Sequence, residues 1–322
     1  MKYRQMGKWG ARLSVVGLGS YLTIGYKLDE EMSRATVKTA YDLGINFFDT
    51  ANAYNRGGAE EMLGKILEDY RRASIFLVTK VFAKMDQGPN DRGLSAKHIR
   101  EQCEASLRRL RMDYVDLYMC HRPDPTAPLE ETVRAMEDLA RQGKIIYWGV
   151  SEWTSKQMVE ANAVAREIGA RQIGVNQPRY SLLYRYPEAQ VFPACLEQGI
   201  GNVVFSPLAH GMLTGKYKPG QDAPSGTRAA DEDTNSVIKS LYWTEQNKLK
   251  AQEFAGIAED LGTTAAALAV AWCLRNPAVT SAIIGATKVE QIEENANAAD
   301  LDIPDEVAER LEALFPAPEA IP

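Results

Sequence analysis

The chain of 322 residues is long enough for one large domain or two medium ones, and its 45% hydrophobic and 25% charged residues are typical of a soluble globular protein. The 37 basic and 43 acidic residues leave a formal net charge of -6, and no local basic patch interrupts this balance, which argues against binding to nucleic acid. No segment has the roughly 18 consecutive apolar residues of a membrane span, and the start of the chain lacks the apolar run of a signal peptide. We therefore expect no membrane insertion and a cytoplasmic location.

The cysteines and histidines do not have the spacings of a metal site. The four cysteines lie far apart, which suits reduced thiols better than a disulfide framework or a zinc site. The three histidines, His98, His121 and His210, are equally scattered. The sequence therefore predicts no bound metal.

Short apolar runs alternate with amphipathic stretches from residue 15 onward. Helical periodicity is clear, for example, at 59–67, 95–110, 129–142 and 154–168. Eight strand-and-helix units predict an α/β fold, a (β/α)8 TIM barrel. An open doubly wound sheet is the competing architecture, but it usually has fewer strands and gathers its polar residues at one switch point. The runs predicted as strands are 15–18, 45–48, 75–79, 115–119, 145–150, 173–175, 203–205 and 281–284.

Three segments depart from strict alternation. Residues 1–13 are predicted to form an N-terminal hairpin that closes the barrel bottom, and residues 208–243, which are polar and rich in Gly and Pro, a functional loop after the seventh strand. Two extra helices, 289–299 and 305–315, follow the last strand and precede a Pro-rich tail that we expect to be frayed. No change of composition marks a linker, so residues 1–322 are predicted to form a single domain.

Polar residues follow every predicted strand, at the end of a barrel where enzymes of this fold keep their active sites. Asp49, Lys80 and His121 end three neighbouring strands about 4.8 Å apart, and Tyr54 follows in the loop after Asp49. Each has an ordinary structural explanation: a turn cap for Asp49, strand protection for Lys80, and core packing for His121 and Tyr54. These separate structural explanations are less convincing when all four residues lie at one face. The polar residues that follow the eight predicted strands are Gly19-Ser20-Tyr21, Asp49, Lys80, His121, Ser151, Gln177, Ser206 and Gly285-Ala286-Thr287.

Together these side chains can form a proton donor. A nearby Lys80 ammonium would lower the pKa of Tyr54 from its usual value of about 10. Asp49 would hold Lys80 in place, and His121 could donate a hydrogen bond to a carbonyl oxygen on which charge develops. Because no side chain supplies hydride, this interpretation requires a nicotinamide or a flavin.

The Rossmann fingerprint is absent, since Gly17-Leu-Gly19 lacks its third glycine and the ribose-binding acid. A different phosphate site is predicted where Gly285-Ala286-Thr287-Lys288 leads from the last strand into a helix, with Ser206-Pro207-Leu208 and Lys216 in the preceding long loop. Simple helix capping by Thr287 is the alternative explanation.

These residues resemble the aldo-keto reductases. The resemblance rests on Asp-Thr-Ala-x-x-Tyr at 49–54, Thr-Lys at 79–80, His-Arg-Pro at 121–123 and Gly-Val-Ser at 149–151, and it extends from Tyr3 to about Leu314. The phrases HRPDP, GKIIYWGVSEW, FSPLAHGMLTGKY and IIGATKVEQIEEN are most similar to the branch that holds the voltage-gated potassium channel beta subunits and their bacterial relatives.

The resemblance implies a catalytic tetrad of Asp49, Tyr54, Lys80 and His121, with Tyr54 as the acid, and NADPH as the cofactor. It implies that Ser151 and Gln177 bind the nicotinamide carboxamide, that Phe205 stacks on the ring, and that Ser20, Tyr21 and Asp49 lie near that end. Ser206, Leu208 and Lys216 would contact the pyrophosphate. The residues implied around the adenosine and its 2'-phosphate are Arg228, Gly285, Thr287, Gln291, Glu294 and Asn295.

Three positions depart from the patterns of this family. Channel beta subunits carry Asn where His121 stands, so the complete tetrad favours a working reductase. Many reductases carry Asn where Glu152 stands. Gln291 occupies a position where many relatives have Arg, which leaves NADH open as a second cofactor.

The predicted function is therefore an NAD(P)H-dependent oxidoreductase that reduces small aldehydes or ketones. One alternative is a cofactor-binding regulatory subunit of a membrane channel. A second is a lyase that forms an imine on Lys80, although a lysine paired with Asp49 should stay protonated. Tyr21, Phe82 and Tyr180 are candidate walls of the substrate pocket, and the chain is expected to be a monomer or a homo-oligomer.

Overall fold

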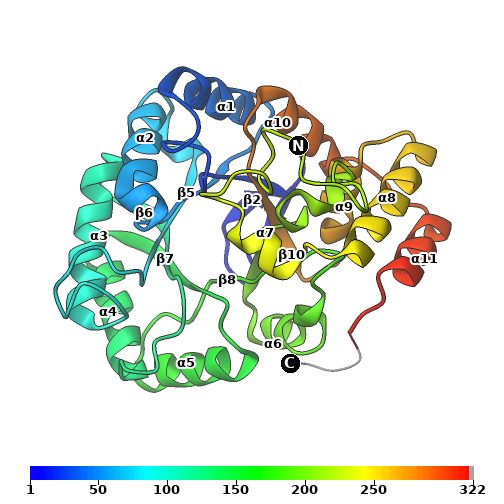
Figure 1. Ribbon diagram of the computed structural model, residues 1–322. Coiled ribbons are helices and arrows are strands. Elements are labelled where there is room, and N and C mark those ends of the chain that lie inside the picture. Colours follow the sequence, from blue (N-terminus) through cyan, green and yellow to red (C-terminus); the bar gives the residue numbers. More distant parts are fainter. Residues whose placement is uncertain (319–322) are drawn as a thin grey trace.

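The computed structural model describes residues 1–318, in which eight parallel strands close into a barrel surrounded by helices (Figure 1). Strand β10 (Val279–Ile284) pairs with β3 (Val16–Gly19) and so joins the two ends of the sheet. The predicted (β/α)8 barrel is confirmed. Between β3 and β10 the sheet runs in chain order through β4 (Phe47–Asp49), β5 (Phe76–Val81), β6 (Val115–Cys120), β7 (Ile145–Ser151), β8 (Val175–Gln177) and β9 (Gly201–Phe205).

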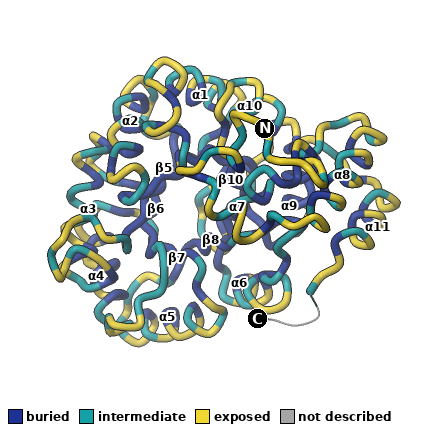
Figure 2. Tube along the Cα trace, in the orientation of Figure 1, coloured by how far each residue is buried: buried dark blue, intermediate teal, exposed yellow. Residues whose placement is uncertain are grey.

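Helices form the outer layer, and Figure 2 shows their outward faces exposed around buried strands. Several begin at side-chain caps: Ser95 accepts a hydrogen bond from the His98 amide, and Thr154 forms a capping box with Gln157. The helices are α1 (Glu30–Asp42), α2 (Gly58–Leu67), α3 (Ala96–Leu110), α4 (Leu129–Arg141), α5 (Ser155–Glu167), α6 (Val191–Gln198), α7 (Ser236–Leu241), α8 (Glu245–Asp260), α9 (Ala265–Arg275), α10 (Val289–Ala296) and α11 (Asp305–Leu314).

All eight predicted strands lie within two residues of the observed ones. The sixth was predicted at 173–175, but β8 begins only at Val175 and ends at Gln177. Its start is displaced because the amide of Ile173 bonds to the side chain of Asn162 in α5, at 2.9 Å, rather than to a neighbouring strand. Gln177 is therefore the last residue of its strand and does not follow it. Asp49 and Ser151 also end their strands, and Lys80 lies inside β5.

An N-terminal hairpin covers the bottom of the barrel, as predicted. Its strands β1 (Tyr3–Gln5) and β2 (Arg12–Ser14) pair antiparallel. Met6 and Leu13 are fully buried against apolar side chains of the barrel interior. Between the strands, Gly7 has a φ of +54°, and a Cβ there would lie 2.3 Å from the carbonyl oxygen of Gly199, so this close approach requires glycine.

The long connection after β9 is more ordered than the predicted loop. It contains a 3-10 segment, η4 (Ala209–Thr214), and helix α7. Met212 and Tyr217 anchor it because their side chains are fully buried. Lys27, in the loop after β3, forms an ion pair with Asp231 and so ties the connection to that loop.

The two predicted C-terminal helices are present as α10, which continues into a short 3-10 turn at Asn297–Ala299, and α11. The last residues of the predicted Pro-rich tail, 319–322, lie outside the described residues. Within residues 1–318 no single helix is long and apolar enough to cross a membrane; α8 and α9 meet that test only as a pair bent by 90°. The same residues contain no cluster of potential metal ligands.

Candidate active site

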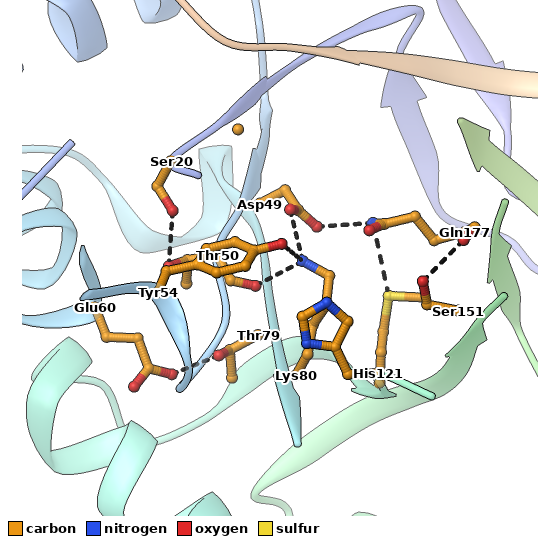
Figure 3. Close-up of polar contacts among 12 residues, drawn as sticks. Ser20, Asp49, Thr50, Tyr54, Glu60, Thr79, Lys80, His121, Ser151 and Gln177 are labelled. Carbon is orange, nitrogen blue, oxygen red and sulfur yellow. Dashed lines mark hydrogen bonds and ion pairs between the residues drawn. The ribbon is translucent and has the colours of Figure 1, made fainter. Parts of the chain in front are cut away.

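Four polar side chains meet at the carboxyl ends of β4, β5 and β6 (Figure 3). Asp49 is the last residue of β4, and the long side chain of Lys80 in β5 brings its ammonium to 2.6 Å from Asp49 Oδ1. The same nitrogen lies 2.8 Å from the Thr50 carbonyl oxygen and 3.3 Å from the Tyr54 hydroxyl. His121 follows β6, and its ring lies edge-on to that of Tyr54 with centroids 5.8 Å apart.

The three contacts of Lys80 define its chemistry. An ammonium has three N–H donors and no acceptor, and Asp49, Thr50 and Tyr54 supply three acceptors. The Tyr54 hydroxyl oxygen therefore accepts from Lys80, which leaves its own proton free to be donated elsewhere. Because its three N–H groups are engaged and its side chain is 0% exposed, Lys80 has no access to a substrate carbonyl, which argues against an imine-forming lysine.

A second buried carboxylate supports β5 from behind. Glu60 in α2 accepts a hydrogen bond from the hydroxyl of Thr79, the residue before Lys80. Its other oxygen accepts from Arg109 Nε of α3 at 2.6 Å. The two bonds fix the end of β5 against both helices, and Lys80 is positioned with it.

Tyr54 begins a tight turn, η1 (Tyr54–Gly57), in which Asn55 and Arg56 have φ angles of 47° and 52°. The Tyr54 ring lies over the Lys80 ammonium, whose nitrogen is 5.0 Å from the ring centroid, and this centroid is 5.0 Å from that of Tyr21. A cavity of about 210 Å³ opens beside the two rings. It is lined by Ser20, Tyr21, Leu22, Ile24, Tyr26, Ala53, Tyr54, Asn55 and Ala59.

The pKa of Tyr54 departs from the sequence-based expectation. Burial raises the pKa well above its ordinary value, and the charges of Asp49 and Tyr21 raise it further, whereas Arg122 lowers it. The expected lowering by Lys80 is wrong for this structure, because burial disfavours the phenolate and the adjacent Asp49 carboxylate opposes the ammonium. Burial lowers the pKa of Lys80 because it disfavours the ammonium, and the charge of Asp49 acts in the opposite direction.

His121 is a neutral imidazole at the mouth of the barrel. Its pKa lies well below the ordinary value because burial and the charges of Lys80 and Arg122 all disfavour the cation. A neutral imidazole can still donate one hydrogen bond. Arg122 donates to the His121 carbonyl oxygen at 2.5 Å and to Ser151 Oγ at 3.4 Å, and it has no carboxylate partner within residues 1–318.

The residues predicted near a nicotinamide adjoin this cluster. Gln177 Nε2 donates to Asp49 Oδ2 at 2.8 Å, and Ser151 Oγ donates to the Gln177 carbonyl oxygen at 2.9 Å. Ser20 Oγ donates to Thr50 Oγ1 at 2.9 Å. Asp49 is thus held from two sides, by Lys80 and by Gln177.

Glu152 has an uncommon backbone conformation. Its φ is 57°, and its carboxylate accepts a hydrogen bond from the Arg179 amide at 2.7 Å. The Arg179 guanidinium in turn lies 5.9 Å from the centroid of the Phe205 ring, the predicted stacking residue. Glu152 therefore joins the loop after β7 to the loop after β8.

The predicted pyrophosphate contacts gather in the connection after β9. Ser206, Ala209 and His210 are left-handed, with φ angles of 58°, 46° and 57°. The amides of Ala209 and Gly211 donate to the carbonyl oxygens of Ser206 and Leu208, so these two amides are not available to an anion. Lys216 lies over Gly211, 3.2 Å from the position that a Cβ would take there. Leu208, the remaining predicted contact, precedes η4.

Five of the six predicted adenosine contacts lie in α10 or just before it, whereas Arg228 lies in the connection after β9 and bonds to His210. Gln291 turns its side-chain oxygen back to accept from the Thr287 amide at 2.8 Å, so it caps its own helix. Asn295 is buried, and its Oδ1 atom has no partner within the described residues. Gly285 is exposed, and only Thr23 lies near the place where a Cβ would stand. Glu294 is half-buried on the same helix.

These features fit a phosphate-bearing nucleotide. Lys216 and Arg228 form no ion pair with a carboxylate within residues 1–318, so both side chains can bind an anion. The orphaned Asn295 oxygen can accept from a base amine. Sequence reasoning missed His210, which bonds to both Ser206 and Arg228, because a lone histidine in a loop carries no motif.

The comparisons with known proteins agree with this geometry. A family model described as Aldo/keto reductase family matches residues 15–315. A protein of Oryza sativa subsp. japonica named "Probable voltage-gated potassium channel subunit beta" is 43% identical over 321 residues, 98% of this chain and 96% of that protein. A protein of Arabidopsis thaliana with the same name is 43% identical over 305 residues, 94% and 92% of the two chains. With a family match across the whole barrel and relatives similar over nearly their full length, the chain belongs to the aldo/keto reductase family.

Proposed function

We propose that the protein is an NADPH-dependent reductase of small aldehydes and ketones, in which Tyr54 donates the proton. Membership of the family implies NAD(P)H-dependent oxidoreduction of small carbonyl compounds. The observation that carries the proposal is the hydrogen bond from Lys80 to the Tyr54 hydroxyl, which orients a free tyrosine proton beside His121 and a cavity.

Each member of the tetrad has a separate role. A bound reduced nicotinamide would supply the hydride that the carbonyl carbon accepts. Tyr54 protonates the oxygen as negative charge develops on it, because an alkoxide is a stronger base than a phenolate. His121, held neutral, donates a hydrogen bond to the same oxygen as charge develops on it. The Lys80 ammonium, held by Asp49, stabilises the phenolate that remains on Tyr54.

The cofactor contacts also remain a proposal. Ser20, Tyr21, Ser151, Gln177 and Phe205 would hold the nicotinamide end. NADPH is favoured because Arg228 and Lys216 supply unpaired positive charge, whereas Gln291 caps its own helix and adds none, which keeps NADH in consideration. The remaining proposed contacts are Ser206, Leu208, Gly285, Thr287, Glu294 and Asn295.

Oxidation of NADPH and of NADH with a panel of aldehydes, ketones and quinones tests the proposal. Tyr54→Phe removes only the donated proton, so turnover should fall by at least about a hundredfold while cofactor binding, followed by quenching of tryptophan fluorescence, stays close to that of the wild type. Turnover that survives in Tyr54→Phe would show that another group is the acid.

A second candidate function is a cofactor-binding regulatory subunit of a membrane channel. It is favoured by the names of the two relatives that are 43% identical to this chain. This candidate predicts tight NADPH binding without turnover on any carbonyl compound, together with recovery of a channel protein in a pull-down. A cytoplasmic location and a monomeric or homo-oligomeric state are proposed for either function.

A further inference from the structure

His210 lies at the centre of the connection after β9, between two of the proposed phosphate contacts. Its Nε2 atom is 3.1 Å from Ser206 Oγ, and its Nδ1 atom is 3.1 Å from Arg228 Nη1. The imidazole is half-buried, and its ring lies 6.0 Å from that of Tyr242. It therefore joins two residues that are 22 positions apart in the sequence, 206 and 228.

The directions of the two hydrogen bonds follow from the donors available. A guanidinium only donates, so Nδ1 of His210 must be the unprotonated, accepting nitrogen. Nε2 then carries the proton and donates it to Ser206 Oγ. Because Ser206 accepts this bond, its own hydroxyl proton is directed away from the imidazole. Arg228 thus donates to His210, and His210 donates to Ser206. We call this chain of two hydrogen bonds the relay.

The charge state of His210 agrees with this relay. Burial, together with the positive charges of Arg228 and Arg179, lowers the pKa of His210 to about 3. The imidazole thus stays neutral at physiological pH and keeps an acceptor for Arg228. Protonation would place two donors face to face, which the buried site disfavours.

The backbone at this point explains why such a link is needed. Ser206, Ala209 and His210 are non-glycine residues with positive φ, and Gly211 follows with a φ of 95°. Left-handed backbone is unfavourable for a residue other than glycine, so the segment needs contacts that hold it in place. The buried Ala209 side chain anchors one face, while the two bonds of His210 fix the polar face.

We propose that His210 is a positioning residue for the phosphate groups of the dinucleotide: it neither contacts the reacting atoms nor carries charge, but it orients the Ser206 hydroxyl and the Arg228 guanidinium toward the anion. This inference rests on the proposed cofactor binding and extends it to a residue outside the tetrad and outside the predicted contacts. It requires that His210 act on ligand affinity only through Ser206 and Arg228.

The test is a set of dissociation constants for NADPH and NADH, measured on the full chain by quenching of tryptophan fluorescence. His210→Phe keeps a flat ring but removes both hydrogen bonds, one of them to a charged group, so NADPH binding should weaken by about tenfold or more. His210→Gln offers one acceptor and one donor in the same order and should recover most of the loss. Thermal unfolding of each variant checks that it is folded, and His210→Ala replaces His210→Phe if that variant is not.

A mutant cycle separates positioning from a purely structural role. In a Ser206→Ala/Arg228→Met background, His210→Phe should change the NADPH dissociation constant by less than about twofold, because its two partners are gone. An equal loss in both backgrounds would overturn the relay, as would a His210→Gln protein that binds as weakly as His210→Phe.

The binding measurements distinguish a failure of the proposed cofactor binding from a failure of the role of His210. A wild-type protein that binds neither NADPH nor NADH would refute the proposed function and, with it, the role of His210. Tight binding by the wild type and equally tight binding by His210→Phe would refute the role of His210 alone.

Discussion

Replacing Asp49 by Asn tests the electrostatics of the tetrad through stability rather than activity. Asp49 is 3% exposed and its two oxygens accept from Lys80 and from Gln177. Asn keeps the shape but removes the negative charge, so the Lys80 ammonium is left buried without its counter-ion. Breaking a buried pair in this way costs about 3 to 5 kcal/mol, and we expect the lower end because Asn retains one acceptor oxygen.

The loss of stability caused by Asp49→Asn should become smaller as the pH rises. Burial already lowers the pKa of Lys80 in the folded protein, and Asp49 opposes this lowering. Without Asp49 the folded-state pKa falls further below the unfolded value, so the unfolded chain binds more protons between the two. The free energy of unfolding of Asp49→Asn should therefore rise with pH across that interval, by at most about 1.4 kcal/mol per pH unit. The wild type should change less.

Glu60→Gln is the matched control. Glu60 is equally buried and bonds to Thr79 and Arg109, but a guanidinium does not lose its proton in proteins. Its destabilisation should stay constant over the same pH range. Urea unfolding of the three proteins at intervals from about pH 7 to 10 measures both effects. A pH-independent cost in Asp49→Asn, or one below about 1 kcal/mol, would refute the view that Lys80 is held charged by Asp49.

Three further outcomes are expected. Gly64→Ala should destabilise the protein by about 1 to 3 kcal/mol, since its Cβ would lie 2.5 Å from the backbone oxygen of Leu110, whereas Gly256→Ala in α8 has open space and should stabilise by about 0.5 to 1 kcal/mol in thermal or urea unfolding. Turnover should be flat from about pH 6 to 9, because Tyr54 keeps its proton below a raised pKa and His121 stays neutral above a lowered one; a steep titration in this range would contradict these assignments. All four cysteines are buried, so a thiol reagent should label none of them in the native protein and all four after unfolding; rapid native labelling would show that the barrel opens readily.

The alternation of apolar runs and helical periodicity was sufficient to predict the barrel. Each parallel strand is buried on both faces, so its apolar run stands out in the sequence, and caps such as Ser95 and Thr154 mark where helices begin. The predicted bounds of β8, 173–175, were two residues too early, because the amide of Ile173 donates to the side chain of Asn162 in a neighbouring helix.

The convergence of the candidate site followed from the same rule, because parallel strands place their carboxyl ends at one mouth. Asp49, Lys80 and Tyr54 meet there as their motif indicates, while their catalytic roles stay a prediction. The sequence could not determine the pKa of Tyr54. Its direction depends on how deeply the ring is buried and on which charges lie nearest, and neither is recorded in residue order.

The amino-acid sequence by itself determined the fold, the family resemblance and the residue types at the barrel mouth, since these depend on periodicity and on short motifs. Only the tertiary structure decided which polar groups bond to one another across loops. The link from Arg228 through His210 to Ser206 depends on left-handed turns that bring distant positions within 3.1 Å, and no spacing in the chain encodes that approach. Hydrogen bonds between loops are set by the three-dimensional path of the backbone, whereas periodicity reports only average burial.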